Sequence, residues 1–158
     1  MRTLDYVLGE LCKVILPISE EIFYGNKNSS VAICTLSSIN LLKEISNSEL
    51  LGKVAIAGRL LSENKGIDSL IRNVNSNKNI KTIIICGKEV WGHKAGNSLL
   101  KLYENGIDSN GRIINSHSPD PFLDVSQDQV NNFQNQVQLI DKIGETRFSE
   151  IKKLIDSV

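Results

Sequence analysis

The chain has 158 residues, of which 41% are hydrophobic and 23% are charged, as expected for one soluble globular domain. Eighteen basic side chains balance 18 acidic ones, and 5% of the residues are aromatic. We therefore expect no nucleic-acid binding. No stretch is long and apolar enough to predict a membrane span. Cys12, Cys34 and Cys86 are far apart and lie in apolar runs, and no signal-peptide pattern opens the chain. These features predict free buried thiols and a cytoplasmic location.

The first element expected along the chain is an amphipathic helix. Apolar residues recur at helical spacing between positions 4 and 15, and Pro17 is placed to end the helix. A cluster of turn-forming residues follows at 25–30. We expect residues 1–28 to form a helical extension and residues 29–158 to form an α/β domain.

Short apolar runs then alternate with helical patterns. Strands are expected at 31–35, 54–57, 82–86 and 112–114. Helices are expected at 38–48, at 67–74, from the glycine-rich turn to about 105, at 130–140 and at 151–155. The strand runs are continuously apolar rather than alternating, which is typical of a mostly parallel sheet with helices on both faces. The sequence therefore predicts a Rossmann-like α/β fold.

In such folds, ligands bind beyond the carboxyl ends of the strands. The residues after the three main strands are expected to meet at one edge, and they occupy positions 35–37, 58–60 and 87–96. Glu63 and Asn64 follow the second strand. Two roles stay open for them, namely capping of the next helix and hydrogen bonding to the amides of a cofactor.

The glycine-rich turn at 87–96 contains one of the two histidines of the chain. Its pattern, Gly87 followed by Gly92, His93 and Lys94, nearly matches a P-loop. However, His93 replaces the phosphate-binding lysine, and Lys94 replaces the magnesium-binding Ser or Thr. Nucleotide or phosphate binding would therefore rest only on the N–H groups that begin the following helix.

His93 is also a candidate metal ligand, against the alternative of a structural histidine. The positive end of a helix dipole disfavours imidazolium, and a metal requires the neutral ring. Gly96 lies one helical turn further on, where the missing side chain is expected to leave room for a flat group. One protein ligand suits a tetrapyrrole or a corrinoid, which supplies its other donors itself. No second histidine or cysteine lies nearby to favour zinc.

Trp91, within this turn, and His117, in a later loop, allow two interpretations each. Trp91 is expected to pack under the turn, with shielding of a cofactor face as the alternative. His117 lies in a loop with Pro119 and Pro121, where we expect it to be exposed unless the loop folds over a ligand.

Across residues 30–155 the chain resembles the A subunit of tetrahydromethanopterin S-methyltransferase, which carries the corrinoid of a methanogen membrane complex. The segments that carry the resemblance are VAICTL at 31–36, AIAG at 55–58, SENKGI at 62–67, residues 75–80, CGKEV at 86–90, GHKAG at 92–96, YENGID at 103–108, GRII at 111–114, PF at 121–122 and FQNQV at 133–137.

The resemblance implies a cobamide held in the Rossmann-like domain, with His93 as the lower axial ligand to cobalt. Cobalt would take a methyl group from methyl-tetrahydromethanopterin and pass it to coenzyme M, cycling between Co(I) and methyl-Co(III). Other methyltransferase subunits are the implied partners. The candidate cofactor-binding residues are Thr35, Leu36, Gly58, Leu60, Glu63, Asn64, Gly87, Glu89, Gly92, His93, Gly96 and Pro121.

The chain also departs from the family pattern. The family's carboxyl-terminal membrane anchor has no counterpart, which suits either a truncated chain or a soluble homologue, and a polar loop at 115–120 replaces a glycine-rich apolar stretch. Trp91 stands where common cobalamin domains place an aspartate that contacts the histidine, so a carboxylate partner must come from elsewhere, with Glu89 as a candidate. Whether the chain is catalytic stays open, as do the alternatives of a phosphate-binding module and a non-catalytic scaffold.

Overall fold

The computed structural model describes residues 21–158, and the helix expected at 4–15 lies outside this range. The sheet has five strands in the order β1-β3-β2-β4-β5, and only β1 runs antiparallel to its neighbour. Their bounds are Ile22–Tyr24 (β1), Val31–Cys34 (β2), Ile56–Gly58 (β3), Thr82–Gly87 (β4) and Gln138–Ile143 (β5). The expected Rossmann-like α/β fold with a mostly parallel sheet is confirmed.

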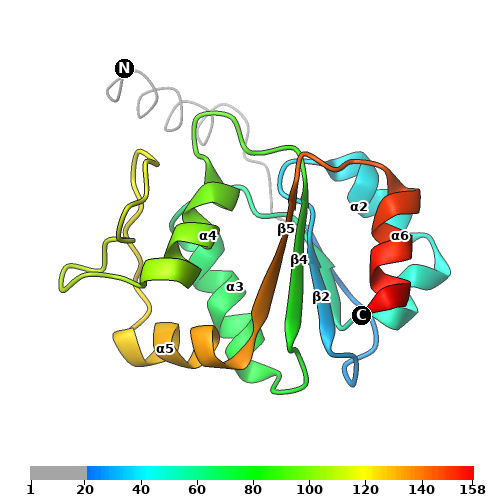
Figure 1. Cartoon of the computed structure of the whole chain (residues 1–158), viewed down its shortest axis with the longest axis horizontal. Helices are drawn as coiled ribbons and strands as arrows, with labels where there is room; N and C mark the ends of the chain where they lie inside the picture. The colour runs from blue at the N-terminus through cyan, green and yellow to red at the C-terminus, as the bar shows by residue number, and fades with distance from the viewer. Residues whose placement is uncertain (1–20) are drawn as a thin grey trace.

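Helices cover both faces of this sheet (Figure 1). One face packs against α3 (Lys65–Ser76), α4 (Ala95–Asn105) and α5 (Gln127–Gln136). The other face packs against α2 (Ile39–Ser46), the short 3-10 helix η1 (Glu49–Lys53) and α6 (Phe148–Ser157). The expected helices at 38–48, at 67–74, after the glycine-rich turn and at 151–155 are thereby confirmed.

Strand β4 shows why its sequence is apolar throughout. All six of its residues are buried, because Ile83 and Ile85 enter one core while Ile84 and Cys86 enter the other. Its neighbours β2 and β5 complete its backbone hydrogen bonding. A strand that is buried on both faces has no polar side, so its sequence cannot alternate.

The helix expected at 130–140 is wrong in its second half. Helix α5 ends at Gln136, Val137 is already extended, and β5 follows at once as an edge strand. The Gln136 side-chain amide donates to the carbonyls of Val74 and Asn77 at 2.9 Å each, and to that of Ile80 at 3.1 Å. This side chain ties the end of α5 to the end of α3, where orphaned helix carbonyls need donors.

Two smaller differences concern strands. Residues 22–24 were expected to belong to the helical extension, and they form the edge strand β1 on β3. The strand expected at 112–114 is wrong, because this segment forms only isolated bridges, Ile113 with Ile107 and Arg112 with Phe122.

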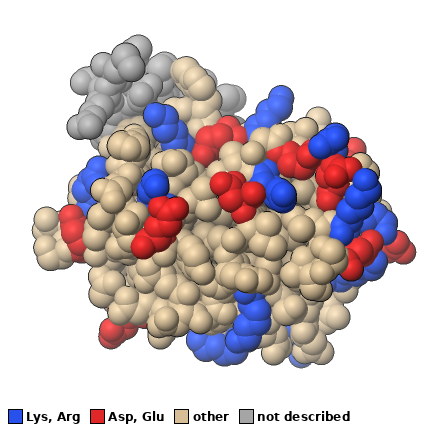
Figure 2. Space-filling model, viewed as in Figure 1, with Lys and Arg blue, Asp and Glu red and all other residues tan. Residues whose placement is uncertain are grey.

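The surface of the described part carries both signs of charge. On the face shown in Figure 2, acidic and basic side chains lie interspersed rather than in one broad patch of either sign. Among residues 21–158, no helix has the length and apolar character needed to cross a membrane.

Candidate functional site

The carboxyl ends of three parallel strands meet at one edge of the sheet, as expected. The Thr35 N–H donates to the Gly58 carbonyl at 2.9 Å, which joins the ends of β2 and β3. The Ser37 hydroxyl donates to the Lys88 carbonyl at 2.8 Å, which joins the ends of β2 and β4. Leu36, between them, is fully buried in a left-handed conformation with φ of 49°. Such strain in a non-glycine residue often accompanies a functional site.

His93 lies at this edge, on the turn between β4 and α4. Its Nδ1 is 2.7 Å from Oε2 of Glu63, which comes from the loop between β3 and α3. Both residues are buried, with exposed fractions of 8% for His93 and 1% for Glu63. In the tautomer that carries its proton on Nδ1, the imidazole donates to this carboxylate, and the lone pair of the neutral ring lies on Nε2.

The other oxygen of Glu63 is bound by a loop from a distant part of the chain. The backbone N–H of Asp120 donates to Oε1 at 3.0 Å. Asn64 anchors Asp120 in turn, because its side-chain amide donates to Oδ2 at 2.9 Å and to the Asp120 carbonyl at 3.3 Å. The Asn64 Oδ1 accepts from the Lys65 N–H at 2.7 Å, so Asn64 also caps α3.

Glu89, which the sequence offered as one candidate carboxylate partner of His93, has a different role. Its carboxylate accepts from the backbone N–H groups of Val90 at 2.7 Å, Gly96 at 2.9 Å and Asn97 at 2.8 Å. It thus occupies the amino-terminal end of α4, where helix N–H groups lack internal partners. The carboxylate that contacts His93 is Glu63, 30 residues earlier in the sequence.

The glycines of the turn differ in what surrounds them. A Cβ on Gly96 would lie 2.9 Å from atoms of Leu36, Glu89 and Ile143, so the open space expected there is filled by the protein itself. A Cβ on Gly87 would lie 2.2 Å from the Thr35 carbonyl oxygen. Gly92, with φ of +81°, has no atom within 4 Å of the corresponding point. The open side of the turn is therefore next to His93 at Gly92.

The exposure of Trp91, His117 and Pro121 tests the remaining expectations about the residues around the site. Trp91 is 74% exposed, so the expectation that it packs under the turn is wrong. His117 is exposed as expected, and Pro121 is buried directly after Asp120.

A cluster of three buried serines, not foreseen from the sequence, holds the 115–121 loop. The Ser98 hydroxyl on α4 lies 2.7 Å from that of Ser116 and 2.5 Å from that of Ser118. Ser118 also donates to the Lys94 carbonyl at 3.3 Å, one residue after His93. The only sequence signal was the density of small polar residues between Asn115 and Pro119, which indicates a loop but not its contacts.

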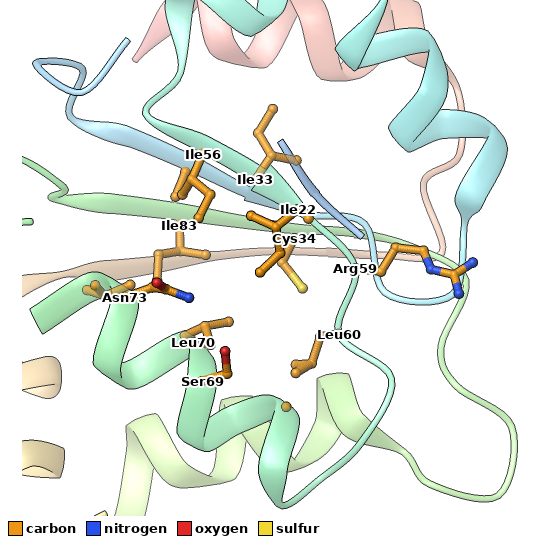
Figure 3. A pocket seen from close by; sticks show the side chains of 14 residues that line it. Ile22, Ile33, Cys34, Ile56, Arg59, Leu60, Ser69, Leu70, Asn73 and Ile83 are labelled. Atoms are coloured by element: carbon orange, nitrogen blue, oxygen red, sulfur yellow. The ribbon is translucent and has the colours of Figure 1, made fainter. Parts of the chain in front are cut away.

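A pocket that is open to solvent lies between α3 and the sheet (Figure 3). Its walls are mainly apolar and include Ile22, Ile56 and Leu70. Gly58 and Leu60 also line it, whereas His93 and Glu63 do not. In Figure 3 the guanidinium group of Arg59 points away from the apolar side chains. The pocket therefore shares the β3 end with the His93 site but is separate from the imidazole.

Within residues 21–158, no cluster of three or more His, Cys, Asp or Glu side chains is arranged to hold an ion. The site contains the buried imidazole of His93, the Glu63 carboxylate bonded to it, and open space beside Gly92.

Comparisons with known proteins point to one family. The MtrA family model, which describes the A subunit of tetrahydromethanopterin S-methyltransferase, matches residues 15–158. The chain is 44% identical over 133 residues to the A subunit of the putative methyltransferase Mtx of Methanosarcina barkeri, covering 83% of this chain and 63% of that protein. It is 41% identical over 135 residues to the A subunit of the tetrahydromethanopterin S-methyltransferase of Methanosphaera stadtmanae, covering 84% and 52%. The chain thus spans about half to two thirds of these relatives.

Proposed function

Since the chain belongs to the MtrA family of tetrahydromethanopterin S-methyltransferase subunits, we propose that it binds a cobamide with His93 as the axial ligand to cobalt. When bound, the cobamide would supply a cobalt centre able to accept and release a methyl group. The role of the chain is then to hold and orient the cofactor. Exchange of the methyl group between a tetrahydromethanopterin donor and a thiol acceptor would depend on partner subunits.

The observation that carries the proposal is the buried contact between His93 Nδ1 and Glu63 Oε2 at 2.7 Å. Metal-binding histidines commonly donate their second ring N–H to a carboxylate, which fixes the tautomer and raises the basicity of the other nitrogen. A corrin ring supplies four equatorial nitrogens, so one imidazole is a sufficient protein contribution. The residues present therefore fit this cofactor.

Each residue of the site has a distinct task in this proposal. Glu63 holds the proton on Nδ1 and sets the orientation of the ring. Gly92 leaves the side of the turn open, so that a large planar group can approach. Glu89 secures the first turn of α4 and thereby the backbone on which His93 stands.

The same contacts weigh against phosphate binding at the glycine-rich turn. A phosphate would need the N–H groups at the start of α4, and those of Gly96 and Asn97 already bond the Glu89 carboxylate. A second anion beside this carboxylate would meet like-charge repulsion.

Binding can be measured through Trp91, the only tryptophan of the chain. We expect cobalamin to quench its fluorescence with saturation, because the corrin absorbs and would lie close to the turn. His93→Ala should weaken binding by at least about tenfold, and Glu63→Gln by about 10–100-fold. His117→Ala is the matched control, since this second histidine is exposed in a loop. Equal affinities for His93→Ala and His117→Ala would contradict the proposal.

A further inference from the structure

The loop at 115–121 contacts the candidate site from two directions. Ser118 reaches the carbonyl of Lys94, directly after His93, and the Asp120 N–H reaches Glu63. Ser116 and Ser118 are both buried, and each bonds the buried hydroxyl of Ser98. The loop is thus fixed to α4 on one side and to the β3–α3 connection on the other.

The Asn64 side chain holds the loop to the β3–α3 connection through its bonds to Asp120. One end of its amide caps α3 through the Lys65 N–H, and the other end donates to both the carbonyl and the carboxylate of Asp120. Because a rigid helix start holds Asn64, Asp120 is held at a defined place. Its N–H then points at Oε1 of Glu63.

The Glu63 carboxylate is consequently bound at both oxygens. With Oε1 on the Asp120 N–H, rotation of the carboxylate is restricted, and Oε2 stays 2.7 Å from Nδ1 of His93. A carboxylate with one free oxygen would exchange orientations and share its contact with water. The geometry of the His93 contact therefore depends on a residue that touches neither the imidazole nor, in our proposal, the cobalt.

We propose that Asn64 and Asp120 are positioning residues that hold the Glu63 carboxylate and thereby keep the His93 proton on Nδ1. This inference rests on the proposed function for its purpose, because only the Nδ1–H tautomer presents the Nε2 lone pair to a metal. The tautomer itself is a property of the protein without cofactor. It can be measured whether or not a cobamide binds.

The test is nuclear magnetic resonance of the cofactor-free protein labelled with ¹⁵N-histidine, at a pH where the ring is neutral. A His117→Asn background leaves His93 as the only histidine, so the ring signals need no further assignment. The ¹⁵N shifts of the two ring nitrogens give the ratio of Nδ1–H to Nε2–H tautomers. Glu63→Ala defines the shift expected when the carboxylate is lost.

Asn64→Ser keeps a hydroxyl that can cap α3 but removes the amide that reaches Asp120. We expect it to shift the tautomer ratio toward Nε2–H by at least half of the Glu63→Ala shift. Asn75→Ser is the matched control, because it removes an amide that donates to the Gln129 carbonyl at 2.9 Å, at the other end of α3. It should leave the ratio unchanged.

A wild-type ratio in Asn64→Ser, or a predominant Nε2–H tautomer in the parent protein, would overturn the inference. If Asn64→Ser does not fold, Asp120→Ala decides in its place, since it removes the Oδ2 acceptor but keeps the backbone N–H. The Trp91 titration with cobalamin is independent of these spectra. Loss of cobalamin binding with the expected tautomer shifts would reject the proposed function and keep the positioning role.

Discussion

At the scale of single residues, the site is built from contacts that the sequence separates widely. His93 depends on Glu63, Glu63 depends on Asp120, and Asp120 depends on Asn64. The histidine and the glycine-rich turn could be found by motif, because their spacing is local. The partner carboxylate could not, because 30 residues separate it from His93. Glu63 comes near only because β3 and β4 both pair in parallel with β2 in the folded sheet.

From its spacing to His93, Gly96 was expected to leave room for a flat ligand. In the structure the position is filled by neighbouring side chains of the protein. Its hydrogen atom lies against Leu36, Glu89 and Ile143, so the glycine serves close packing inside the protein. Gly96→Ala would place a methyl group 2.9 Å from each of these side chains. We expect a loss of about 1–3 kcal/mol in the free energy of unfolding, because overpacking forces neighbours to move.

Urea unfolding followed by circular dichroism measures this loss. Gly52→Ala is the control, since nothing lies within 4 Å of its Cβ position and the change should stay within about 0.5 kcal/mol. If the two variants were equally stable, the close packing assigned to Gly96 would be incorrect.

Cys86 predicts a dependence of stability on pH. Burial, with smaller contributions from Cys34 and Glu145, raises the pKa of its thiol far above the ordinary value of 9.0. The folded state therefore keeps the thiol neutral, and its contribution to stability is fully present below pH 9. As the pH rises above 9, the unfolded chain gains stability by ionising, so the free energy of unfolding falls.

Between pH 8 and pH 10 this effect amounts to about 1.4 kcal/mol. Urea unfolding of the wild type and of Cys86→Ala at both values isolates it, since other groups titrate equally in both proteins. Between pH 8 and pH 10, the free energy of unfolding of the wild type should fall by that amount more than the free energy of unfolding of Cys86→Ala. A difference that is independent of pH would show that the Cys86 thiol ionises alike in both states.

At the scale of elements, the buried strands and their following helices were predictable, and the end of α5 was not. Val130, Phe133, Val137 and Ile140 follow one helical spacing, and no glycine or proline separates Gln136 from Gln138. At the helix end, the Gln136 amide bonds three carbonyls at and just beyond the end of α3, a tertiary contact that the local spacing does not reveal. β5 is an edge strand with partly exposed residues, so it lacks the apolar run that marked β4.

Asp68 shows how an element holds a loop. It is 2% exposed in the first turn of α3, and its carboxylate accepts from the N–H groups of Asp124 and Val125 at 3.0–3.1 Å. Asp68→Ala would leave these donors without their partner, and we expect a loss of about 1–3 kcal/mol in the free energy of unfolding.

Asp128→Ala is the matched control, because Asp128 is an exposed residue in the first turn of α5. Its replacement should cost at most about 0.5 kcal/mol. An Asp68→Ala midpoint in urea as high as that of Asp128→Ala would contradict the role given to this carboxylate.

At the scale of the whole molecule, parallel β2, β3 and β4 bring three loops to one edge, and a fourth loop, 115–121, closes on them. The family and the fold were predictable because the apolar runs, the turns and the GHKAG segment are local in sequence. Membership of this family and the His93–Glu63 contact lead to the same proposal, a cobamide carrier that works with partner subunits. Its central claim is a bond between His93 and cobalt.

The most direct test is the electron paramagnetic resonance spectrum of a Co(II) cobamide reconstituted with the His117→Asn protein, prepared with ¹⁴N- and ¹⁵N-histidine. The account predicts a superhyperfine splitting that changes with the isotope and disappears in His93→Ala. A spectrum identical to that of the free cobamide, or one that the isotope leaves unchanged, would contradict the assignment of His93 as the axial ligand.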